Sequence, residues 1–222
     1  NAAWLGVQRQ PAPNGERVAI DFHGDIRIVP TEQGVGEPDV VASSAWRENN
    51  GVFSPDGKTL AYISDESGEQ EVWLYDVETH AKRRMTNQQS EKARVTWASN
   101  SQKFAYVADN KLWEVDLSLP QAQQQPREIA NNNAGGFSIS EYAADGTWMV
   151  YSRRDDENNA DVYLYDIRAK KEYNVTQSPS TETLGALTPD GKSVVFNSNR
   201  DGALNQLFVV SLAKLAEDAN DP

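Results

Sequence analysis

The chain of 222 residues contains no cysteine and only two histidines, His23 and His80. Without cysteine it has neither disulfides nor thiolate metal sites. The two histidines occupy unrelated places, one in a short polar loop and one after an apolar run. We therefore expect surface histidines and not a metal site or a general base. The compartment stays open between a cytoplasmic and a periplasmic location.

Long apolar runs and excess basic charge are also missing. No apolar run approaches the roughly 18 residues that a membrane span needs, and the start "NAAWLGVQRQ" lacks the features of a signal peptide, so we expect a soluble chain without membrane insertion.

Acidic residues number 33 against 21 basic ones, which gives a formal net charge of −12. This field repels phosphate backbones, so nucleic acid is excluded as a partner. The acidity indicates a solvated surface or, as the alternative, attraction of cationic ligands.

The common catalytic signatures are absent as well. The sequence has no G-x-S-x-G elbow, no H-E-x-x-H, no phosphate-binding loop and no dinucleotide fingerprint. Acidic side chains cluster only in polar loops, and they lack the spacing of a calcium loop: Asp65, Glu66, Glu69, Asp155, Asp156, Glu157 and Asp161. We expect no catalytic residue, no cofactor and no metal in this chain.

What the sequence does contain is a repeat. "FSPDGKTLAYI" (53–63) aligns without gaps on residues 97–107, 142–152 and 187–197, and more faintly on 11–21. One position of each copy serves as an anchor: Gly15, Gly57, Ser101, Gly146 and Gly191. The anchors lie 42, 44, 45 and 45 residues apart, so five repeats tile the chain.

Each repeat has the pattern of four short strands. A first strand leads to a tight turn where glycine supplies the positive φ, and a β-branched or aromatic strand follows. After a polar loop comes a third apolar run, at 26–30, 72–76, 112–116, 162–166 and 207–211. Segments such as "KRRMT" (82–86) and "KEYNVT" (171–176) predict a short fourth strand. Four strands in every 40–45 residues are typical of a β-propeller blade.

The predicted fold is therefore an all-β β-propeller of four-stranded antiparallel blades over residues 1–212. The repeats lie near 6–46, 47–90, 91–135, 136–180 and 181–212, and 213–222 form a tail or linker. The only helix candidate is "SLAKLAEDANDP" (211–222). Five repeats allow a five-bladed ring or a fragment of a larger ring. Because the last repeat lacks a convincing fourth strand after Leu212, either residues 1–7 complete it or the ring stays open at one edge.

Positions that recur in register are expected to serve packing. Two such positions are aromatic, one in the second strand (Tyr62, Tyr106, Tyr151, Phe196) and one in the third (Trp73, Trp113, Tyr163, Phe208). The aspartates that close the third strand, Asp76, Asp116 and Asp166, are expected to accept hydrogen bonds from the backbone of the following turn.

Function on a repeated scaffold is expected where the repeats differ. The loop between the second and third strands is long in repeats two, four and five and short in repeats one and three. The first strand of each blade is expected to line a central channel, with its upstream loop at one rim. These segments carry a mixed set of charges: Arg47, Glu48, Lys92, Arg94, Glu141 and Glu182. We expect solvated loops there, with a rim that contacts extended peptides or a protein partner as the alternative.

The best-formed repeat, "FSPDGKTLAYISDESGEQEVWLYDVETHAKRRMT", resembles the propeller repeats of the TolB and tricorn protease type. The succession of the five repeats is similar to the second, larger propeller of tricorn-type peptidases over essentially the whole chain. Two departures are the missing proline at Gly51 and the lost D-G turn at Ser101, and they leave ligand contacts unassigned.

The resemblance implies a serine peptidase whose nucleophile and bases lie in other modules. This chain would then be a non-catalytic element that admits or sorts short peptides and supports assembly of the parent protein. The rival interpretation is a TolB-like protein-binding scaffold of the cell envelope. A gene that continues into a PDZ-like and serine peptidase region favours the first, and a gene that ends near Pro222 after an amino-terminal signal favours the second. A propeller enzyme such as a lactonase or glycosidase is disfavoured, because clustered histidines and buried acid pairs are lacking.

Overall fold

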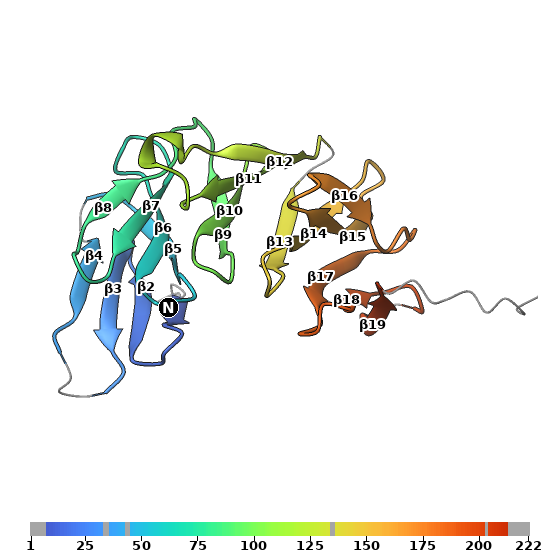
Figure 1. Cartoon of the computed structure of the whole chain (residues 1–222), viewed down its shortest axis with the longest axis horizontal. Coiled ribbons are helices and arrows are strands. Elements are labelled where there is room, and N and C mark those ends of the chain that lie inside the picture. The colour runs from blue at the N-terminus through green and yellow to red at the C-terminus, as the bar shows by residue number, and fades with distance from the viewer. Residues whose placement is uncertain (1–7, 33–35, 43–44, 134–135, 203, 213–222) are drawn as a thin grey trace, which may run out of the picture. The chain divides into compact units, whose positions relative to one another are not determined.

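The computed structural model of the chain describes residues 8–32, 36–42, 45–133, 136–202 and 204–212. Within these ranges the regular structure consists of β-strands and one short 3-10 turn, η1 (Gln121–Gln123). The strands form five separate antiparallel sheets (Figure 1), and in each sheet the strand order follows the chain order. The predicted tail, 213–222, lies outside the described residues. No helix in the described part is long and apolar enough to cross a membrane.

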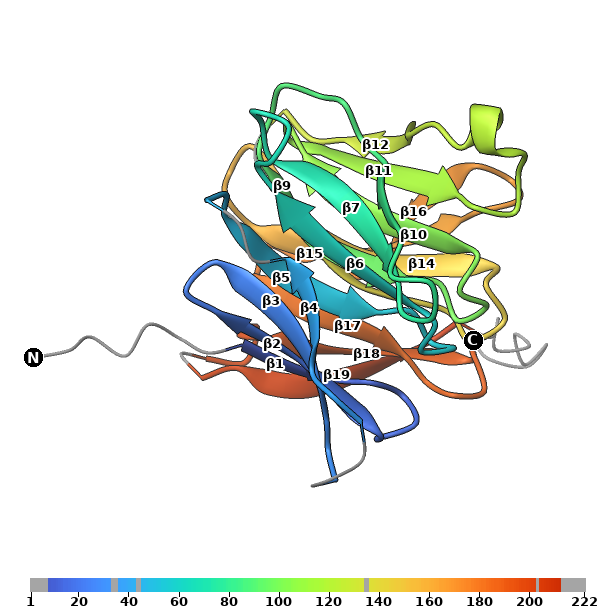
Figure 2. The same ribbon diagram turned by 90° about the vertical axis from the view of Figure 1, so that its left-hand side faces the viewer.

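The chain divides into two compact bodies, and the amino-terminal one (residues 1–131) holds three four-stranded sheets. The first contains β1 (Gln8–Pro11), β2 (Arg17–Phe22), β3 (Asp25–Pro30) and β4 (Asp39–Ala42). The second contains β5 (Glu48–Phe53), β6 (Thr59–Ser64), β7 (Glu71–Asp76) and β8 (Lys82–Arg84). The third contains β9 (Lys92–Trp97), β10 (Lys103–Ala108), β11 (Lys111–Asp116) and β12 (Arg127–Asn131). Within this body, sheet β5–β8 lies between the other two (Figure 2).

The carboxyl-terminal body (residues 132–222) holds the other two sheets. One contains β13 (Phe137–Tyr142), β14 (Trp148–Arg154), β15 (Ala160–Asp166) and β16 (Lys171–Asn174). The last contains only three strands in the described part of the chain, β17 (Glu182–Leu187), β18 (Ser193–Ser198) and β19 (Gln206–Ser211). The predicted all-β fold with four-stranded antiparallel blades is confirmed, including the short fourth strands β8 and β16.

The repeated turn follows the backbone rule that the sequence indicates. Gly15, Gly57, Gly146 and Gly191 have φ between 68° and 73°, where a residue without Cβ is not strained. Ser101 takes the same conformation at φ 60°. Its Oγ accepts a hydrogen bond of 3.0 Å from the backbone N–H of Asp56 in the preceding blade. The departure at Ser101 therefore leaves the turn intact and adds a contact between two blades.

Side chains of adjacent sheets interlock to form the core between the blades. Tyr62, Tyr106 and Tyr151 are fully buried, which confirms the packing role of the recurrent second-strand aromatic. In the amino-terminal body, Val72 and Leu74 of one blade share a cluster with Phe104 of the next. The same arrangement recurs in the carboxyl-terminal body between β15 and β18. Within each body, adjacent blades therefore pack face against face.

The closing aspartates have the predicted structural role. The Oδ1 of Asp76 accepts hydrogen bonds from the N–H groups of Glu78 at 3.1 Å and Thr79 at 2.7 Å. These bonds hold the pKa of Asp76 below its usual value, with the Thr79 N–H as the largest cause. Asp116 and Asp166 accept equivalent bonds from the turns that follow them.

A second recurrent device ties the fourth strand to the third. The Thr176 hydroxyl donates to Oδ1 of Asp161 at 2.7 Å and accepts a hydrogen bond of 3.0 Å from the N–H of Val162. Thr86 makes the same two contacts in its blade, with Glu71 and with the N–H of Val72. The threonine that ends each of these repeats therefore links the end of the fourth strand to the third strand. We call this pair of hydrogen bonds the threonine clasp.

Candidate functional site

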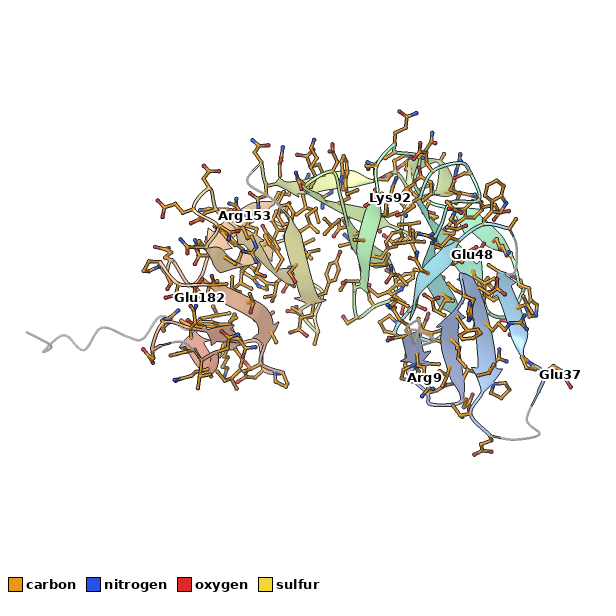
Figure 3. All side chains as sticks on the ribbon, turned by 180° about the vertical axis from the view of Figure 1, so that it is seen from behind. Arg9, Glu37, Glu48, Lys92, Arg153 and Glu182 are labelled. Carbon is orange, nitrogen blue, oxygen red and sulfur yellow. The ribbon has the colours of Figure 1, made fainter. Side chains whose placement is uncertain are left out.

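Three of the six charged residues proposed for the rim are buried. Glu48, Lys92 and Glu182 are the first residues of β5, β9 and β17, and their side chains lie within the amino-terminal or the carboxyl-terminal body (Figure 3). They are 1 %, 3 % and 0 % exposed, so the expectation of solvated loops is wrong for them. All three stand nine residues before the turn anchor of their repeat, a position that Phe137 fills in the fourth blade. The residue type at this position differs among these four blades, but the side chain is buried in each of them.

Lys92 is held by the preceding blade. Its Nζ lies 3.0 Å from Oε2 of Glu71 and donates to the backbone oxygens of Gln88 and, at 2.8 Å, Ser90. The Glu71 carboxylate also accepts the N–H of Gln88 at 2.8 Å and the Thr86 hydroxyl. A buried pair with this many hydrogen bonds is satisfied internally. Lys92 therefore joins two blades and is not available to a ligand.

Glu182 and Glu141 also serve the packing of the carboxyl-terminal body. Oε1 of Glu182 accepts the Ser198 hydroxyl at 2.8 Å and a guanidinium nitrogen of Arg200 at 3.0 Å. Oε1 of Glu141 accepts the backbone N–H of Leu187 at 2.6 Å, which links β13 to β17. The Glu182 contacts lie within the fifth blade, whereas the Glu141 contact joins the fourth blade to the fifth.

Arg47 is exposed, and the side chain of Arg94 lies outside the described part of the chain. The backbone N–H of Arg47 donates to Oδ1 of Asp65 at 2.7 Å, whereas its exposed guanidinium makes no hydrogen bond or ion pair with the residues that the structure describes. Its neighbour Trp46 is 48 % exposed. Exposed tryptophan and arginine side chains are the residue types enriched at protein interfaces.

The β2–β3 hairpin brings a second aromatic side chain to this end of β5. The N–H of Glu48 donates to the backbone oxygen of Gly24 at 2.8 Å, so the hairpin tip lies against the start of β5. Phe22 is 50 % exposed, and its ring lies 4.0 Å from that of His23, which is exposed as predicted. We call the surface formed by Phe22, His23, Trp46 and Arg47 the hairpin junction.

A pocket of about 310 Å³ lies between the first strands of the first two blades, on the same pair of sheets as the hairpin junction. It is lined by residues from β1, β2, β3 and β5: Gln8, Arg9, Gln10, Ala19, Asp21, Ile26, Asn50, Gly51 and Val52. Asp21 supplies the only carboxylate of this lining. Burial raises the pKa of Asp21, and a 3.2 Å hydrogen bond from the N–H of Asn50 opposes that shift.

An irregularity in β5 presents that N–H to Asp21. The register with β6 shifts between Asn49 and Val52, and Asn50 lies in the left-handed region at φ 56°. The side chain of Asn50 donates to Oδ1 of Asn49 at 2.7 Å, which holds the bulge in shape. A register shift at this place recurs in β9, β13 and β17, so the bulge itself belongs to the blade pattern, and the contact of Asn50 with Asp21 is what distinguishes β5. Sequence reasoning missed this pocket, and the only available signal was the pair of asparagines before Gly51.

The acidic loops do not converge on a metal site in the described residues, where no group of three potential ligands was found. Oδ1 of Asp155 accepts the N–H groups of Glu157 and Asn159 within its own loop, at 3.0 and 2.8 Å. Oδ2 of Asp161 accepts the Asn174 side-chain amide at 2.8 Å. These carboxylates therefore order their own hairpin and its neighbouring strand.

The repeats are similar to those of known propellers. Tol-Pal system protein TolB of Helicobacter pylori is 31 % identical over 83 residues, which are 37 % of this chain and 20 % of that protein. The chain thus aligns with about a fifth of the length of that relative. Three solved structures share the fold. TolB from Acinetobacter baumannii has a TM-score of 0.63 and 19 % identity, and the match covers 92 % of this chain and 49 % of that one. The tricorn protease has a TM-score of 0.75 and 14 % identity, with 93 % of this chain and 21 % of that one covered, and dipeptidyl peptidase 4 of Porphyromonas gingivalis has a TM-score of 0.71 and 14 % identity, with 96 % and 38 % covered.

The family described as the prolyl oligopeptidase N-terminal beta-propeller domain matches residues 43–221. This range takes in the four best-formed repeats and most of the chain. With its TolB-type repeats and its antiparallel blades, the chain belongs to the prolyl oligopeptidase N-terminal beta-propeller domain family.

Proposed function

We propose that this chain is the non-catalytic propeller domain of a larger tricorn-like serine peptidase, where it admits or sorts short peptides and supports assembly. The observation that carries the proposal is the family match over residues 43–221, because the matched domain is by description the amino-terminal propeller of a peptidase. The tricorn protease covers 93 % of this chain with only 21 % of its own length. The catalytic groups would then belong to other modules of the parent protein.

The hairpin junction supports a role in contacting peptides. Trp46, Phe22 and Arg47 combine exposed aromatic surface with an unengaged guanidinium. An extended peptide gains from aromatic contacts and from charge-assisted hydrogen bonds at such a surface. Both histidines are engaged with aromatic side chains, His23 with Phe22 and His80 with Tyr75, which favours a binding role over catalysis.

The experiment is calorimetric titration of the 222-residue chain with a mixed library of short peptides, followed by mass spectrometry of the peptides. We expect weak binding and intact peptides. Trp46→Ala should weaken binding, whereas Leu119→Ala, which removes a comparably exposed side chain on another blade, should not. Cleaved peptides would contradict the non-catalytic assignment, and absence of binding would contradict a role in sorting peptides.

The second candidate is a TolB-like protein-binding scaffold of the cell envelope. The 31 % identity with TolB of Helicobacter pylori over 83 residues favours it specifically. A chain that ignores short peptides but binds a folded envelope protein through the hairpin junction would support this candidate. The parent peptidase would then be unnecessary to its function.

A further inference from the structure

The pocket beside Asp21 has the size of a subsite for one side chain. Its volume of about 310 Å³ is at the lower end of the roughly 300–1,000 Å³ that is usual for ligand pockets. Its floor is apolar, since Ala19 and Ile26 are buried in the core between the first two blades. Its polar lining residues are Gln8, Gln10 and Asn50, which carry amides, the carboxylate-bearing Asp21, and Arg9. Such a lining suits an elongated group with an apolar stem and a polar end.

Asp21 differs from the buried carboxylates of Glu71, Glu114 and Glu182 because no cation of its own neutralises it. Glu71, Glu114 and Glu182 are buried and each pairs with a basic side chain at 3.0 Å or less. For Asp21 the structure gives no ion pair with any described residue, and its one hydrogen bond comes from Asn50 at 3.2 Å. A half-buried carboxylate with one long hydrogen bond is an acceptor that lacks a partner.

Arg9 borders the same pocket but is directed away from Asp21 by strand geometry. In the pairing of β1 with β2, Gln8 lies opposite Asp21 and Arg9 lies opposite Ile20. Residues that are directly opposite share one face of a sheet, and the next residue takes the other face. The side chain of Gln8 therefore accompanies Asp21, and that of Arg9 leaves from the opposite face. The charge within the pocket is negative.

We propose that this pocket binds the protonated side chain of a lysine or arginine in a peptide. The inference rests on the proposed function, and it names the feature of the peptide that this site would select. The carbon stem lies along Ala19 and Ile26, and the cationic end donates to the Asp21 carboxylate and to the amide oxygens. The net charge of −12 favours the approach of cationic groups over long range.

The test uses two blocked peptides, acetyl-Ala-Ala-Lys-Ala-Ala-amide and its norleucine counterpart, titrated by calorimetry into the full chain. The two differ only in the terminal charge of one side chain. The wild type should bind the lysine peptide about tenfold or more tightly than the norleucine peptide, as expected for a hydrogen bond to a charged group. Asp21→Asn should abolish this preference, because the amide keeps an acceptor for the Asn50 N–H but loses the charge.

The matched control is Asp109→Asn, which removes the same charge from an exposed turn of the amino-terminal body. Asn110 beside it has the same left-handed conformation, so asparagine is tolerated in this turn. This control should keep the lysine preference. A preference that survives in Asp21→Asn, or equal binding of the two peptides by the wild type, would overturn the inference and leave the proposed function standing. Failure of both peptides to bind would overturn both.

A third peptide, the norleucine peptide with a free amino terminus, separates the two sources of positive charge. We expect it to bind like its acetylated form. If it instead gained affinity that Asp21→Asn removed, the site would recognise a terminal ammonium, and the assignment to a side chain would be wrong.

Discussion

Replacement of Lys92 by methionine should destabilise the chain strongly, although its place at the start of a strand resembles a surface position in the sequence. The side chain of Lys92 is completely buried and lies 3.0 Å from that of Glu71, which is 3 % exposed. Methionine fills a similar volume without the charge. The substitution leaves the Glu71 carboxylate with the N–H of Gln88 and the Thr86 hydroxyl, and it frees the backbone oxygens of Gln88 and Ser90.

Removal of one partner from a buried ion pair costs about 3–5 kcal/mol, because the remaining charge is left buried without its counter-ion. Since domains of ordinary stability unfold with about 5–15 kcal/mol, much of the stability would be lost. The double variant Glu71→Gln/Lys92→Met should recover a large part of the loss, because no charge is then stranded. Urea unfolding of both variants, followed by tryptophan fluorescence, measures the difference.

The matched control is Arg17→Met, which breaks an ion pair of 2.9 Å with Asp39 on the surface of the same body. The Arg17 side chain is 44 % exposed, so the loss should be no more than about 1 kcal/mol. A loss of that small size for Lys92→Met would refute the reasoning. Lys92 would then be a solvated rim cation after all.

Three further predictions concern single positions. Burial raises the folded pKa of Asp21 above its unfolded value, so the stability contributed by its proton is present at low pH and is lost as pH rises through the folded pKa. Asp21→Asn should therefore raise the urea midpoint at pH 7. This gain should vanish near about pH 3, where the carboxyl is protonated in both the folded and the unfolded chain. Thr176→Val should cost about 1–3 kcal/mol of unfolding free energy in urea melts, because the clasp loses both of its hydrogen bonds. Leu207→Lys should shift the urea midpoint little, since Leu207 is 70 % exposed, whereas Val162→Lys at the equivalent buried position should prevent folding as judged by circular dichroism.

The blades were predictable because their signals are local and repeated. The spacing of the turn anchors located every hairpin between first and second strands, and the apolar runs such as 72–76 located the third strands. Even Ser101 kept the glycine conformation, since the surrounding strands dictate the turn. The recurrent tyrosines were correctly interpreted as packing because a ligand platform has no reason to recur in register.

The role of the charged first-strand residues was not predictable from residue type alone. Glu48, Lys92 and Glu182 follow polar loops and look solvated, but all three are buried in the fold. Glu71, which binds Lys92, lies 21 residues earlier in the sequence and on another strand. These residues stand nine positions before the turn anchor, as does Phe137 in the fourth blade. Because Phe137 is apolar, this shared position indicates burial. The position of a residue within the repeat therefore indicates burial better than its charge does.

The pocket beside Asp21 depends on backbone detail that composition does not encode. A register shift and one left-handed asparagine direct an N–H group toward a carboxylate of the neighbouring blade. Neither Asp21 nor Asn50 belongs to a motif that repeats in the other blades. Sites of this kind become visible only when two blades are placed side by side.

The most direct test of the account is hydrogen–deuterium exchange of the 222-residue chain with and without a saturating mixture of short peptides. The account predicts slower exchange in residues 19–26 and 46–53, which contain the hairpin junction and the wall of the pocket, and unchanged exchange in β19. Protection confined to other blades, or no protection at all, would contradict the claim that this propeller contacts peptides at the junction of its first two described blades.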